Sequence, residues 1–546
     1  MKKGGQENVH HLFQCLYSLG VRHIFICPGS RNAPLINGAV SHNGFELHSV
    51  VDERAAGYMA LGAAQITQVP VVIICTSGTA LLNLFPAVAE AHQLHVPLIV
   101  LSADRPLLLL DCWENQSIHQ KRVFGKYANK YIEWKGLLES KRALGKVDRI
   151  ASKILTYSQF PDKGVVHVNF HFSEPLYFHE PISIYNPFSL VKTNKQFTAP
   201  IFHNHSVKTG RSLMVLCGTG SYQDSIAHEL TLLSQQDALI LCDISSPYRQ
   251  LQSHQHWELL LNSITEEFWL KRKPETLITT GSFLLNKNLK NLIRKHPPKN
   301  HYHLADTNIV RDTFFTKPII LKTLGASLES DMQSNASFKQ TWTQAMDSKS
   351  VQFTKLLQQQ TELTDLWTVS QLMELLPHDA IIHAANSMSV RYVSVCAPNQ
   401  SNRVYSNRGT SGIDGCLSTA IGAALADSKH EHFLISGDLA FFYDINGLWI
   451  EKLPKNLKII LLNNHCGNIF DMIPGPSTSK AGHLFTTPHT RTAHNIAQDF
   501  NIEYFTANKQ QDFTQQVSAF LSCTSLAIFE TTSDPQANQR IWKQLK

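Results

Sequence analysis

The chain has 546 residues, of which 43% are hydrophobic and 17% charged, and it carries a formal net charge of +6. These values are typical of a globular protein of two to four domains, each large enough for its own core. No run of Lys and Arg reaches five residues, so the mild positive charge argues against a nucleic-acid-binding surface and leaves acidic small molecules as partners.

Cysteine usage and hydropathy indicate the cell compartment in which the protein is expected. The ten cysteines are scattered without a C-x-x-C pair, which favours a reducing cytoplasm over a disulfide or zinc framework. Residues 1–6 lead into a polar helical pattern rather than the apolar core of a signal peptide, and no apolar run approaches the length of a membrane span. We therefore expect a cytoplasmic protein without a membrane partner.

Helix and strand patterns alternate through the first third of the chain. Expected helices cover residues 9–19, 33–40, 54–65 and about 80–92, and expected strands cover residues 23–27, 46–51, 71–75 and 98–101. Apolar strands separated by helices predict a parallel sheet that is covered on both faces.

The middle of the chain contains a linker and a further unit. Residues 173–200 contain four prolines without a sustained period, as is typical of a linker. An α/β unit follows over residues 212–318, with expected strands at 213–217, 239–242 and 277–280, and residues 338–363 read as a polar helix.

The last third repeats the pattern of the first. Its expected elements are strands at 380–384, 433–435 and 458–462 and helices at 387–396 and 416–426. The helices at 54–65 and 416–426 precede apolar strands in the same way, which indicates two copies of one α/β domain. We predict three doubly wound parallel-sheet domains, at residues 1–180, 200–345 and 364–546.

Two polar groups in the last third each follow a predicted strand. Gly437 permits a tight turn, Asp438 adds a carboxylate oxygen, and Asn464 offers an amide oxygen after the next strand. A crossover helix, expected at residues 445–452, would bring both oxygens to one edge of a parallel sheet. This pairing predicts a site for Mg²⁺ and a diphosphate, although either half alone is equally an ordinary strand end or turn.

Three stretches resemble one known family. The Gly-Asp and Asn-Asn pair is similar to the thiamine-diphosphate signature. Residues 437–444 (GDLAFFYD), 407–415 (NRGTSGIDG) and 27–35 (CPGSRNAPL) resemble 2-succinyl-5-enolpyruvyl-6-hydroxy-3-cyclohexene-1-carboxylate synthase, an enzyme of menaquinone biosynthesis. The resemblance is strong up to about residue 120 and again from residue 386. It implies a thiamine-diphosphate-binding fold, in which the first domain binds the pyrimidine and the last binds the diphosphate.

The resemblance also implies roles for residues around the cofactor. Glu53 matches the family's catalytic carboxylate, which activates the cofactor by a hydrogen bond to the pyrimidine; from chemistry alone it is equally a solvated helix N-terminus. Ile413 matches the apolar residue that bends the cofactor, although core packing explains it too. The metal ligands implied are Asp438, Asn464 and the carbonyl of Cys466, with Mg²⁺ preferred and Mn²⁺ as an alternative. The remaining cofactor contacts implied are Asn407, Gly437, Leu439 and Ile469.

A third set of residues is expected to bind substrates. The family acts on 2-oxoglutarate and isochorismate, which carry two carboxylates each, and guanidinium groups bind carboxylates in a bidentate manner. Each arginine alone is equally a surface or salt-bridge residue, Ser30 a helix cap, and Gln116 and Ser387 solvated loop residues. The expected substrate contacts are Ser30, Arg31, Arg105, Gln116, Lys287, Ser387, Arg391 and Arg408, of which the last three also count as catalytic.

Three positions depart from the family pattern. His465 and Cys466 stand where glycines usually follow Asn-Asn, so their Cβ atoms are expected to strain the turn or crowd the diphosphate. Asp471 replaces a basic residue of some relatives, and Asn288 replaces one cation of a Lys-Arg pair.

Two rival functions stay open. One is another thiamine-dependent 2-oxo acid decarboxylase or carboligase, against which the 407–415 motif and the set of arginines argue. The other is a non-catalytic relative with a binding role, which the three departures keep open. The expected assembly is a homodimer or homotetramer, in which the first domain of one subunit faces the last domain of another.

Overall fold

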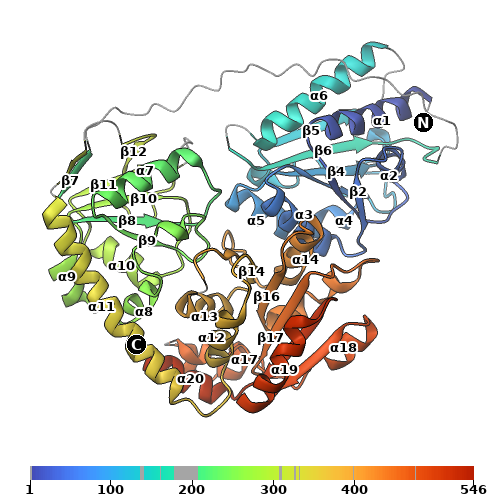
Figure 1. Ribbon diagram of the computed structural model, residues 1–546. Helices are drawn as coiled ribbons and strands as arrows, with labels where there is room; N and C mark the ends of the chain where they lie inside the picture. Colours follow the sequence, from blue (N-terminus) through green and yellow to red (C-terminus); the bar gives the residue numbers. More distant parts are fainter. Residues whose placement is uncertain are drawn as a thin grey trace.

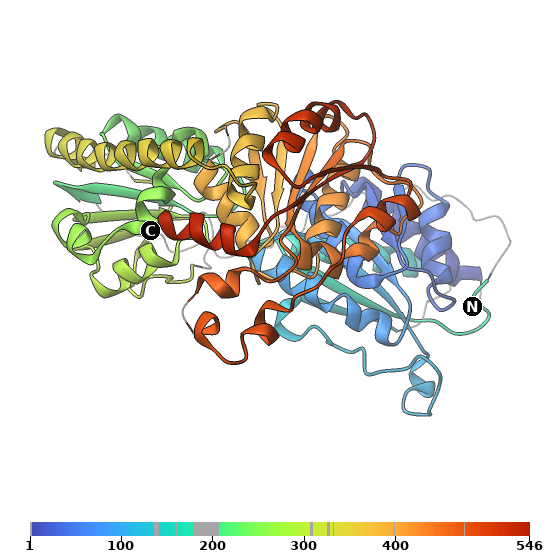
Figure 2. The same cartoon turned by 90° about the horizontal axis from the view of Figure 1, so that it is seen from below.

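The computed structural model describes residues 3–135, 141–159, 162–177, 207–305, 310–324, 328–330, 332–397, 399–473 and 475–545. Three parallel sheets with flanking helices lie at the corners of a triangle (Figure 1). Seen from below, the carboxy-terminal sheet lies between the other two units (Figure 2). The three-domain α/β prediction is confirmed; the domain limits stay a prediction. Most of the expected linker lies outside the described residues.

The amino-terminal sheet has six parallel strands in the order β2-β1-β3-β4-β6-β5. Its strands are β1 (His23–Ile26), β2 (Glu46–Ser49), β3 (Val71–Cys75), β4 (Leu98–Asp104), β5 (Lys130–Lys135) and β6 (Val165–His171). Its helices are α1 (Lys3–Ser18), α2 (Ala33–Val40), α3 (Glu53–Thr67), α4 (Thr79–Asn83), α5 (Phe85–Leu94) and α6 (Lys141–Gln159). The expected helix up to residue 92 is divided into α4 and α5, with Pro86 in the first turn of α5.

The carboxy-terminal sheet has the same strand order, β15-β14-β16-β17-β19-β18. Its strands are β14 (Ile381–Ala384), β15 (Arg403–Tyr405), β16 (His432–Gly437), β17 (Leu457–Asn463), β18 (Glu503–Ala507) and β19 (Ala527–Thr532). Its helices are α12 (Asp365–Leu375), α13 (Met388–Cys396), α14 (Cys416–Ala426), α15 (Asp438–Tyr443), α16 (Ile469–Met472), α17 (Gly482–Thr486), α18 (His494–Asp499), α19 (Gln510–Ser522) and α20 (Pro535–Gln544). The identical strand order bears out the prediction of two copies of one unit.

The central unit is a five-stranded parallel sheet in the order β12-β11-β10-β8-β9. Its strands are β8 (Leu213–Cys217), β9 (Leu239–Cys242), β10 (Thr276–Thr280), β11 (Asn300–Leu304) and β12 (Ile319–Leu321), and β7 (Val207–Gly210) pairs separately with β13 (Leu328–Ser330). Its helices are α7 (Asp224–Gln235), α8 (Trp257–Ser263), α9 (Glu266–Arg272) and α10 (Lys287–Lys295), and α11 (Met332–Gln358) leads toward the last sheet. Short 3₁₀ turns lie at Leu107–Leu109, Gly125–Tyr127, Arg249–Leu251, Ile445–Leu448 and Pro476–Thr478.

The prediction of a crossover helix at residues 445–452 is wrong. The helix in this connection is α15, which begins at Asp438 and ends at Tyr443, and only a 3₁₀ turn follows at Ile445–Leu448. The buried carboxylate of Asp444 accepts hydrogen bonds from the backbone N–H and the hydroxyl of Ser418, both at 2.7 Å. These bonds hold the chain against α14 at the point where the helix was expected to start.

Helices α3 and α14 join the two six-stranded sheets. They are equivalent elements of the two copies, and they lie side by side at the centre of the molecule (Figure 1). A Cβ atom at Gly62 would lie 1.9 Å from the Thr419 carbonyl oxygen, and one at Gly422 would lie 1.9 Å from the Met59 carbonyl oxygen. Only glycine allows this approach, and the interface belongs to one hydrophobic core that includes strands of both sheets.

We expect Gly422→Ala to lower the midpoint of thermal unfolding by at least about 4 °C, because the methyl group must push two backbones apart. Gly145→Ala is the matched control, since a Cβ atom there meets nothing within 4 Å and alanine favours an exposed helix. Calorimetry of both variants checks this expectation. Equal midpoints for the two variants would contradict it.

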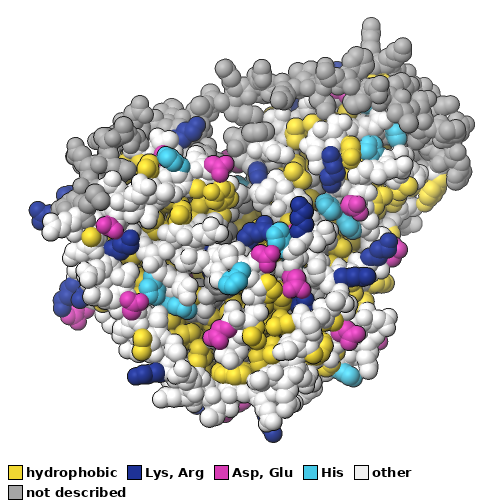
Figure 3. Space-filling view, in the orientation of Figure 1, with side chains coloured by type: hydrophobic (Ala, Val, Ile, Leu, Met, Phe, Trp, Pro, Cys, Tyr) yellow, Lys and Arg dark blue, Asp and Glu magenta, His cyan; other side chains and the backbone are white. Residues whose placement is uncertain are grey.

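Two surface properties of the described residues complete the fold. No helix among them combines the length and the apolar character needed to span a membrane. On the face shown in Figure 3, Lys and Arg side chains are interspersed with Asp and Glu side chains.

Candidate cofactor and substrate site

Asp438 lies directly after β16, at the start of α15, and it is 2% exposed. Its Oδ1 accepts a hydrogen bond from the backbone N–H of Leu439 at 2.6 Å, and its Oδ2 accepts one from Cys466 at 3.1 Å. Burial raises the pKa of this carboxyl to about 7, although the backbone N–H groups lower it. Among the described residues no Lys or Arg pairs with Asp438, and a bound cation would stabilise such a buried carboxyl.

Asn464 follows the neighbouring strand β17 and lies beside Asp438. Its Oδ1 accepts from the same Cys466 N–H that Asp438 uses, at 3.3 Å. Its Nδ2 donates to the buried carboxylate of Asp365 at 2.9 Å, and Ser533 donates to the other oxygen of Asp365 at 2.6 Å. Asp365 therefore turns the amide oxygen of Asn464 toward Asp438, as a ligand to a shared cation requires.

The turn at His465 and Cys466 is strained at one position only. His465 has φ 60°, in the left-handed region that favours glycine, whereas Cys466 is not among the residues with positive φ. The Cys466 carbonyl accepts from the N–H of Asn468 at 2.9 Å, which leaves its second lone pair for a cation. The Cys466 side chain is buried, with its sulfur 3.6 Å from Oδ1 of Asn464.

The structure adds His489 to this site, which the sequence did not indicate. Its Nε2 lies 3.4 Å from Oδ2 of Asp438, and its ring packs against those of Phe442 and His465. Burial and the neighbouring His465 lower the pKa of His489, so it does not neutralise the carboxylate at pH 7. Asp471 accepts from the amide of Asn468 at 3.2 Å and lies close enough to Cys466 to raise the pKa of its thiol.

The loop of residues 407–415 is held in place from both sheets. Asn386 donates to the carbonyl oxygens of Asn407 and Gly412, at 2.8 and 2.7 Å, and Asn407 donates to the hydroxyl of Thr419 at 3.0 Å. Ile413 packs against a small buried cluster that includes Ala440, two residues after Asp438. The loop thus brings Ile413 next to the helix that carries the candidate cation ligand, and Ile469 begins α16 on the other side of the Cys466 turn.

Glu90 was also missed by sequence reasoning. This carboxylate of α5 is fully buried, and it accepts hydrogen bonds from the N–H groups of Gly409 and Thr410 at 2.8 and 2.6 Å. Tyr58 of α3 adds a bond to Asp414 at 3.0 Å. The amino-terminal unit therefore fixes the position of the 407–415 loop.

Glu53 is the first residue of α3, and it is half-buried. Asn83 of its own unit donates to Glu53 at 3.3 Å. Asp52 caps the helix and accepts from the N–H groups of Arg54 and Ala55. Because Asp52 already satisfies the helix end, the carboxylate of Glu53 is available to a ligand.

The predicted basic residues form two groups. In the first, Arg408 donates to Asn386 at 2.9 Å, and Arg391 donates to the carbonyl of Ser387, one turn before it. Burial and the nearby Arg408 hold the pKa of Arg391 below its usual value. Two like charges brought together without full compensation are typical of an anion site.

The central unit contributes cations to this first group. Burial and the charges of Arg408, Arg294 and Lys287 lower the pKa of Lys290 on α10, so Lys290 faces the same region. Asn288 points elsewhere and donates to the carbonyl oxygen of Leu261 at 3.0 Å. Lys290, two residues further along α10, thus adds a cation to this region, although residue 288 itself is uncharged.

The second group lies at the edge of the amino-terminal sheet. Arg31 is buried and pairs with Glu174 at 3.1 Å, and Arg105 donates to the carbonyl oxygen of Asn115 at 3.1 Å. Ser30 and Gln116 are exposed beside them, and Gln116 has φ 53°. This group lies on a different sheet from Arg391 and Arg408.

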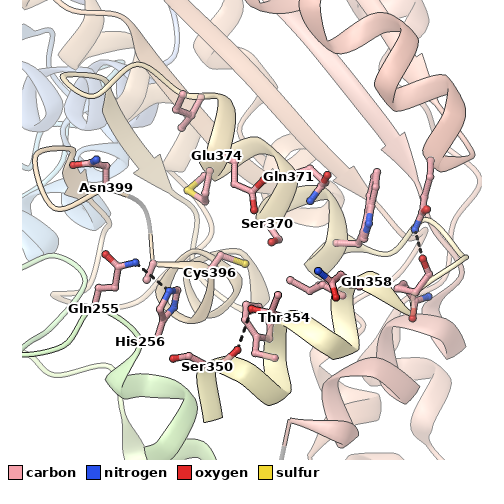
Figure 4. A pocket seen from close by; sticks show the side chains of 18 of the residues that line it. Gln255, His256, Ser350, Thr354, Gln358, Ser370, Gln371, Glu374, Cys396 and Asn399 are labelled. Atoms are coloured by element: carbon pink, nitrogen blue, oxygen red, sulfur yellow. Dashed lines mark hydrogen bonds between the residues drawn. The ribbon is translucent and has the colours of Figure 1, made fainter. Parts of the chain in front are cut away.

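A cavity of about 670 Å³ opens elsewhere, between α11, α12 and the end of α13. Its labelled wall is mostly amide and hydroxyl groups, from residues that include His256, Gln358, Ser370, Gln371, Glu374 and Asn399 (Figure 4). The cavity lies at the C-terminal end of α13, where Ala397 is the cap, whereas Ser387 is at the N-terminal end of this helix. Asp438, Asn464 and Cys466 do not line it, so the cavity is separate from the candidate cation site.

Two family models match the two six-stranded units. The N-terminal thiamine pyrophosphate binding domain matches residues 7–123, and the C-terminal thiamine pyrophosphate binding domain matches residues 385–531. The protein is a thiamine-pyrophosphate enzyme, as the paired sheets and the Asp438 site indicate.

Curated relatives specify the family. Proteins named 2-succinyl-5-enolpyruvyl-6-hydroxy-3-cyclohexene-1-carboxylate synthase are 31% identical in Christiangramia forsetii (92% of this chain, 91% of the relative), 31% in Cytophaga hutchinsonii (99% and 98%) and 32% in Flavobacterium psychrophilum (96% and 95%). The chain belongs to the 2-succinyl-5-enolpyruvyl-6-hydroxy-3-cyclohexene-1-carboxylate synthase family.

The strained turn yields a prediction. His465→Gly should tighten thiamine diphosphate binding, because glycine adopts the left-handed conformation of residue 465 without strain. Each 1.4 kcal/mol of strain relieved in the bound state should lower the dissociation constant about tenfold. Cys466→Gly is the matched control and should not tighten binding, because that residue does not have a positive φ. Calorimetric titration at saturating Mg²⁺ measures both. Equal gains for the two variants would show that the strain is not located at His465.

Proposed function

We propose that this enzyme decarboxylates 2-oxoglutarate with thiamine diphosphate and adds the resulting four-carbon acyl carbanion equivalent to isochorismate. The products are carbon dioxide and 2-succinyl-5-enolpyruvyl-6-hydroxy-3-cyclohexene-1-carboxylate, an intermediate of menaquinone biosynthesis. The observation that carries the proposal is a candidate cation site at Asp438 and Asn464 together with a basic cluster of Arg391, Arg408 and Lys290. Asn386 links the two, because it bonds both to Arg408 and to the loop that packs Ile413 near Ala440.

The residues present fit the cofactor and its cation. Asp438 and Asn464 direct two oxygens at one point, and the Cys466 carbonyl lies in the turn beside them. Mg²⁺ is the metal that such hard oxygen ligands favour, and Mn²⁺ shares that preference. When bound, thiamine diphosphate supplies the electron sink on which a 2-oxo acid loses carbon dioxide.

The chain's own residues bind and orient the cofactor and the substrates, and they transfer protons. Glu53 would donate a hydrogen bond to the pyrimidine of the bound cofactor and so supply the acid–base group that its activation needs. Ile413, packed near Ala440, would support the cofactor from below and position it. Arg391 and Arg408 bind substrate carboxylates with Ser387, and Lys287 and Lys290 extend the basic surface toward the second substrate.

We propose that the enzyme is a dimer, and the position of Glu53 supports this. Within one chain its hydrogen-bond partner is Asn83 of its own unit, and α3 is committed to packing on α14. We infer that the amino-terminal unit of one subunit completes the diphosphate site of another, bringing Ser30, Arg31, Arg105 and Gln116 to the substrate. Sedimentation velocity with and without cofactor tests this assembly.

Carbon dioxide release tests the function directly. We expect release from 2-oxoglutarate with thiamine diphosphate and Mg²⁺, a faster rate when isochorismate is added, and no comparable rate with pyruvate. Asp438→Ala should abolish cofactor binding and release together. Release with equal rates for several 2-oxo acids and no response to isochorismate would favour another decarboxylase or carboligase. Tight cofactor binding without release would favour a non-catalytic role.

Glu53→Gln gives a separate prediction for cofactor activation. It should slow hydrogen–deuterium exchange at the cofactor's thiazolium C2 by on the order of 10²-fold or more while leaving binding largely intact. Asp52→Asn is the matched control, because this neighbouring carboxylate is occupied as the cap of α3 and as the acceptor of a hydrogen bond from Asn446 at 2.9 Å. NMR after acid quench measures the exchange. Exchange at the wild-type rate in Glu53→Gln would remove the assigned role.

A further inference from the structure

A buried polar cluster lies between α1 and α6, on the outer face of the amino-terminal sheet. The two helices lie side by side (Figure 1). His11 and Cys15 are one turn apart on α1 and are 1% and 0% exposed, and Asp148 comes from α6. Their surroundings are apolar, since Leu12, Leu16 and Val147 belong to the same hydrophobic core.

The three side chains converge on one point. His11 Nε2 lies 2.7 Å from Oδ1 of Asp148, Cys15 Sγ lies 3.4 Å from the same oxygen, and Sγ lies 3.8 Å from Nε2. Tetrahedral zinc with ordinary bond lengths would place such ligand atoms about 3.4–3.6 Å apart. The two distances from the Cys15 sulfur agree with this spacing to within a few tenths of an ångström. Only the distance between His11 Nε2 and Asp148 Oδ1 must increase, by less than about 1 Å.

Neighbouring polar groups orient the His11 ring. Its Nδ1 lies 3.4 Å from Oε1 of Gln14, and the amide nitrogen of Gln14 lies 3.4 Å from the ring of His10. His10 in turn contacts the hydroxyl of Ser41 at 2.5 Å. An imidazole that donates its Nδ1–H to an amide oxygen presents the Nε2 lone pair to Cys15 and Asp148, as metal-binding histidines do.

We propose that His11, Cys15 and Asp148 bind a zinc ion that clamps α1 to α6. Nitrogen, thiolate and carboxylate ligands together favour zinc over the hard cation expected at Asp438. On binding, the Cys15 thiol loses its proton to solvent and sulfur bonds to zinc, while water completes the tetrahedron on the side where Asp148 reaches the surface. Sequence spacing did not indicate this site, because its third ligand is far away in the chain.

Cobalt substitution tests the proposal. Full-length protein, stripped of metal and then saturated with Mg²⁺, is titrated with Co²⁺ and subsequently with Zn²⁺. We expect one equivalent of tetrahedral Co²⁺ with a near-ultraviolet thiolate-to-cobalt band, and displacement by Zn²⁺. Cys15→Ser should lose the band, whereas Cys112→Ser, which removes the exposed thiol, should keep it. Asp438→Ala should also keep it, which separates this site from the cofactor's cation.

The affinity of variants provides the second measurement. Asp148→Asn should weaken Zn²⁺ binding, measured by competition with a chromophoric chelator, by at least about tenfold. This variant decides the question if Cys15→Ser does not fold. A wild-type protein without the thiolate band, a band that survives in Cys15→Ser, or unchanged zinc affinity in Asp148→Asn would overturn the proposal and leave a hydrogen-bonded cluster.

Discussion

The contact between α3 and α14 is the constraint on which the candidate site depends. Its two glycines allow each helix to touch the backbone of the other, so two similar sheets are joined with one shared core. Helix α3 begins at Glu53, and α14 follows directly after the 407–415 loop. The same packing therefore positions both the carboxylate proposed to act at a partner subunit's cofactor and the loop proposed to shape this chain's own cofactor pocket.

Electrostatics distinguishes the two ends of that site. At the diphosphate end, Asp438 and Asp365 are buried, and burial raises the pKa of both. At the substrate end, burial lowers the pKa of Arg391, Arg408 and Lys290. Each end is poised for a ligand of opposite charge, a metal ion on one side and carboxylates on the other.

Sequence reasoning reached most of the fold because strand and helix periods are local. The strands before Asp438 and Asn464 lie where their apolar runs indicate, and the meeting of the two side chains follows from parallel pairing. The crossover helix was misplaced because the bonds from Ser418 to Asp444 join segments far apart in the chain. Asp365, Glu90, His489 and Lys290 were missed for the same reason: each acts through a contact between distant elements, and none lies in a motif of its own.

The bonds from Glu90 to Gly409 and Thr410 have a consequence for how the chain can change. The carboxy-terminal unit has its own sheet, yet the loop next to its cofactor site is shaped by a carboxylate from the other end of the chain. A carboxy-terminal unit transplanted onto a different amino-terminal unit would lose the packing of α3 on α14 as well as the shape of that loop. The two units are therefore expected to be inherited together and not to be exchanged separately between related enzymes.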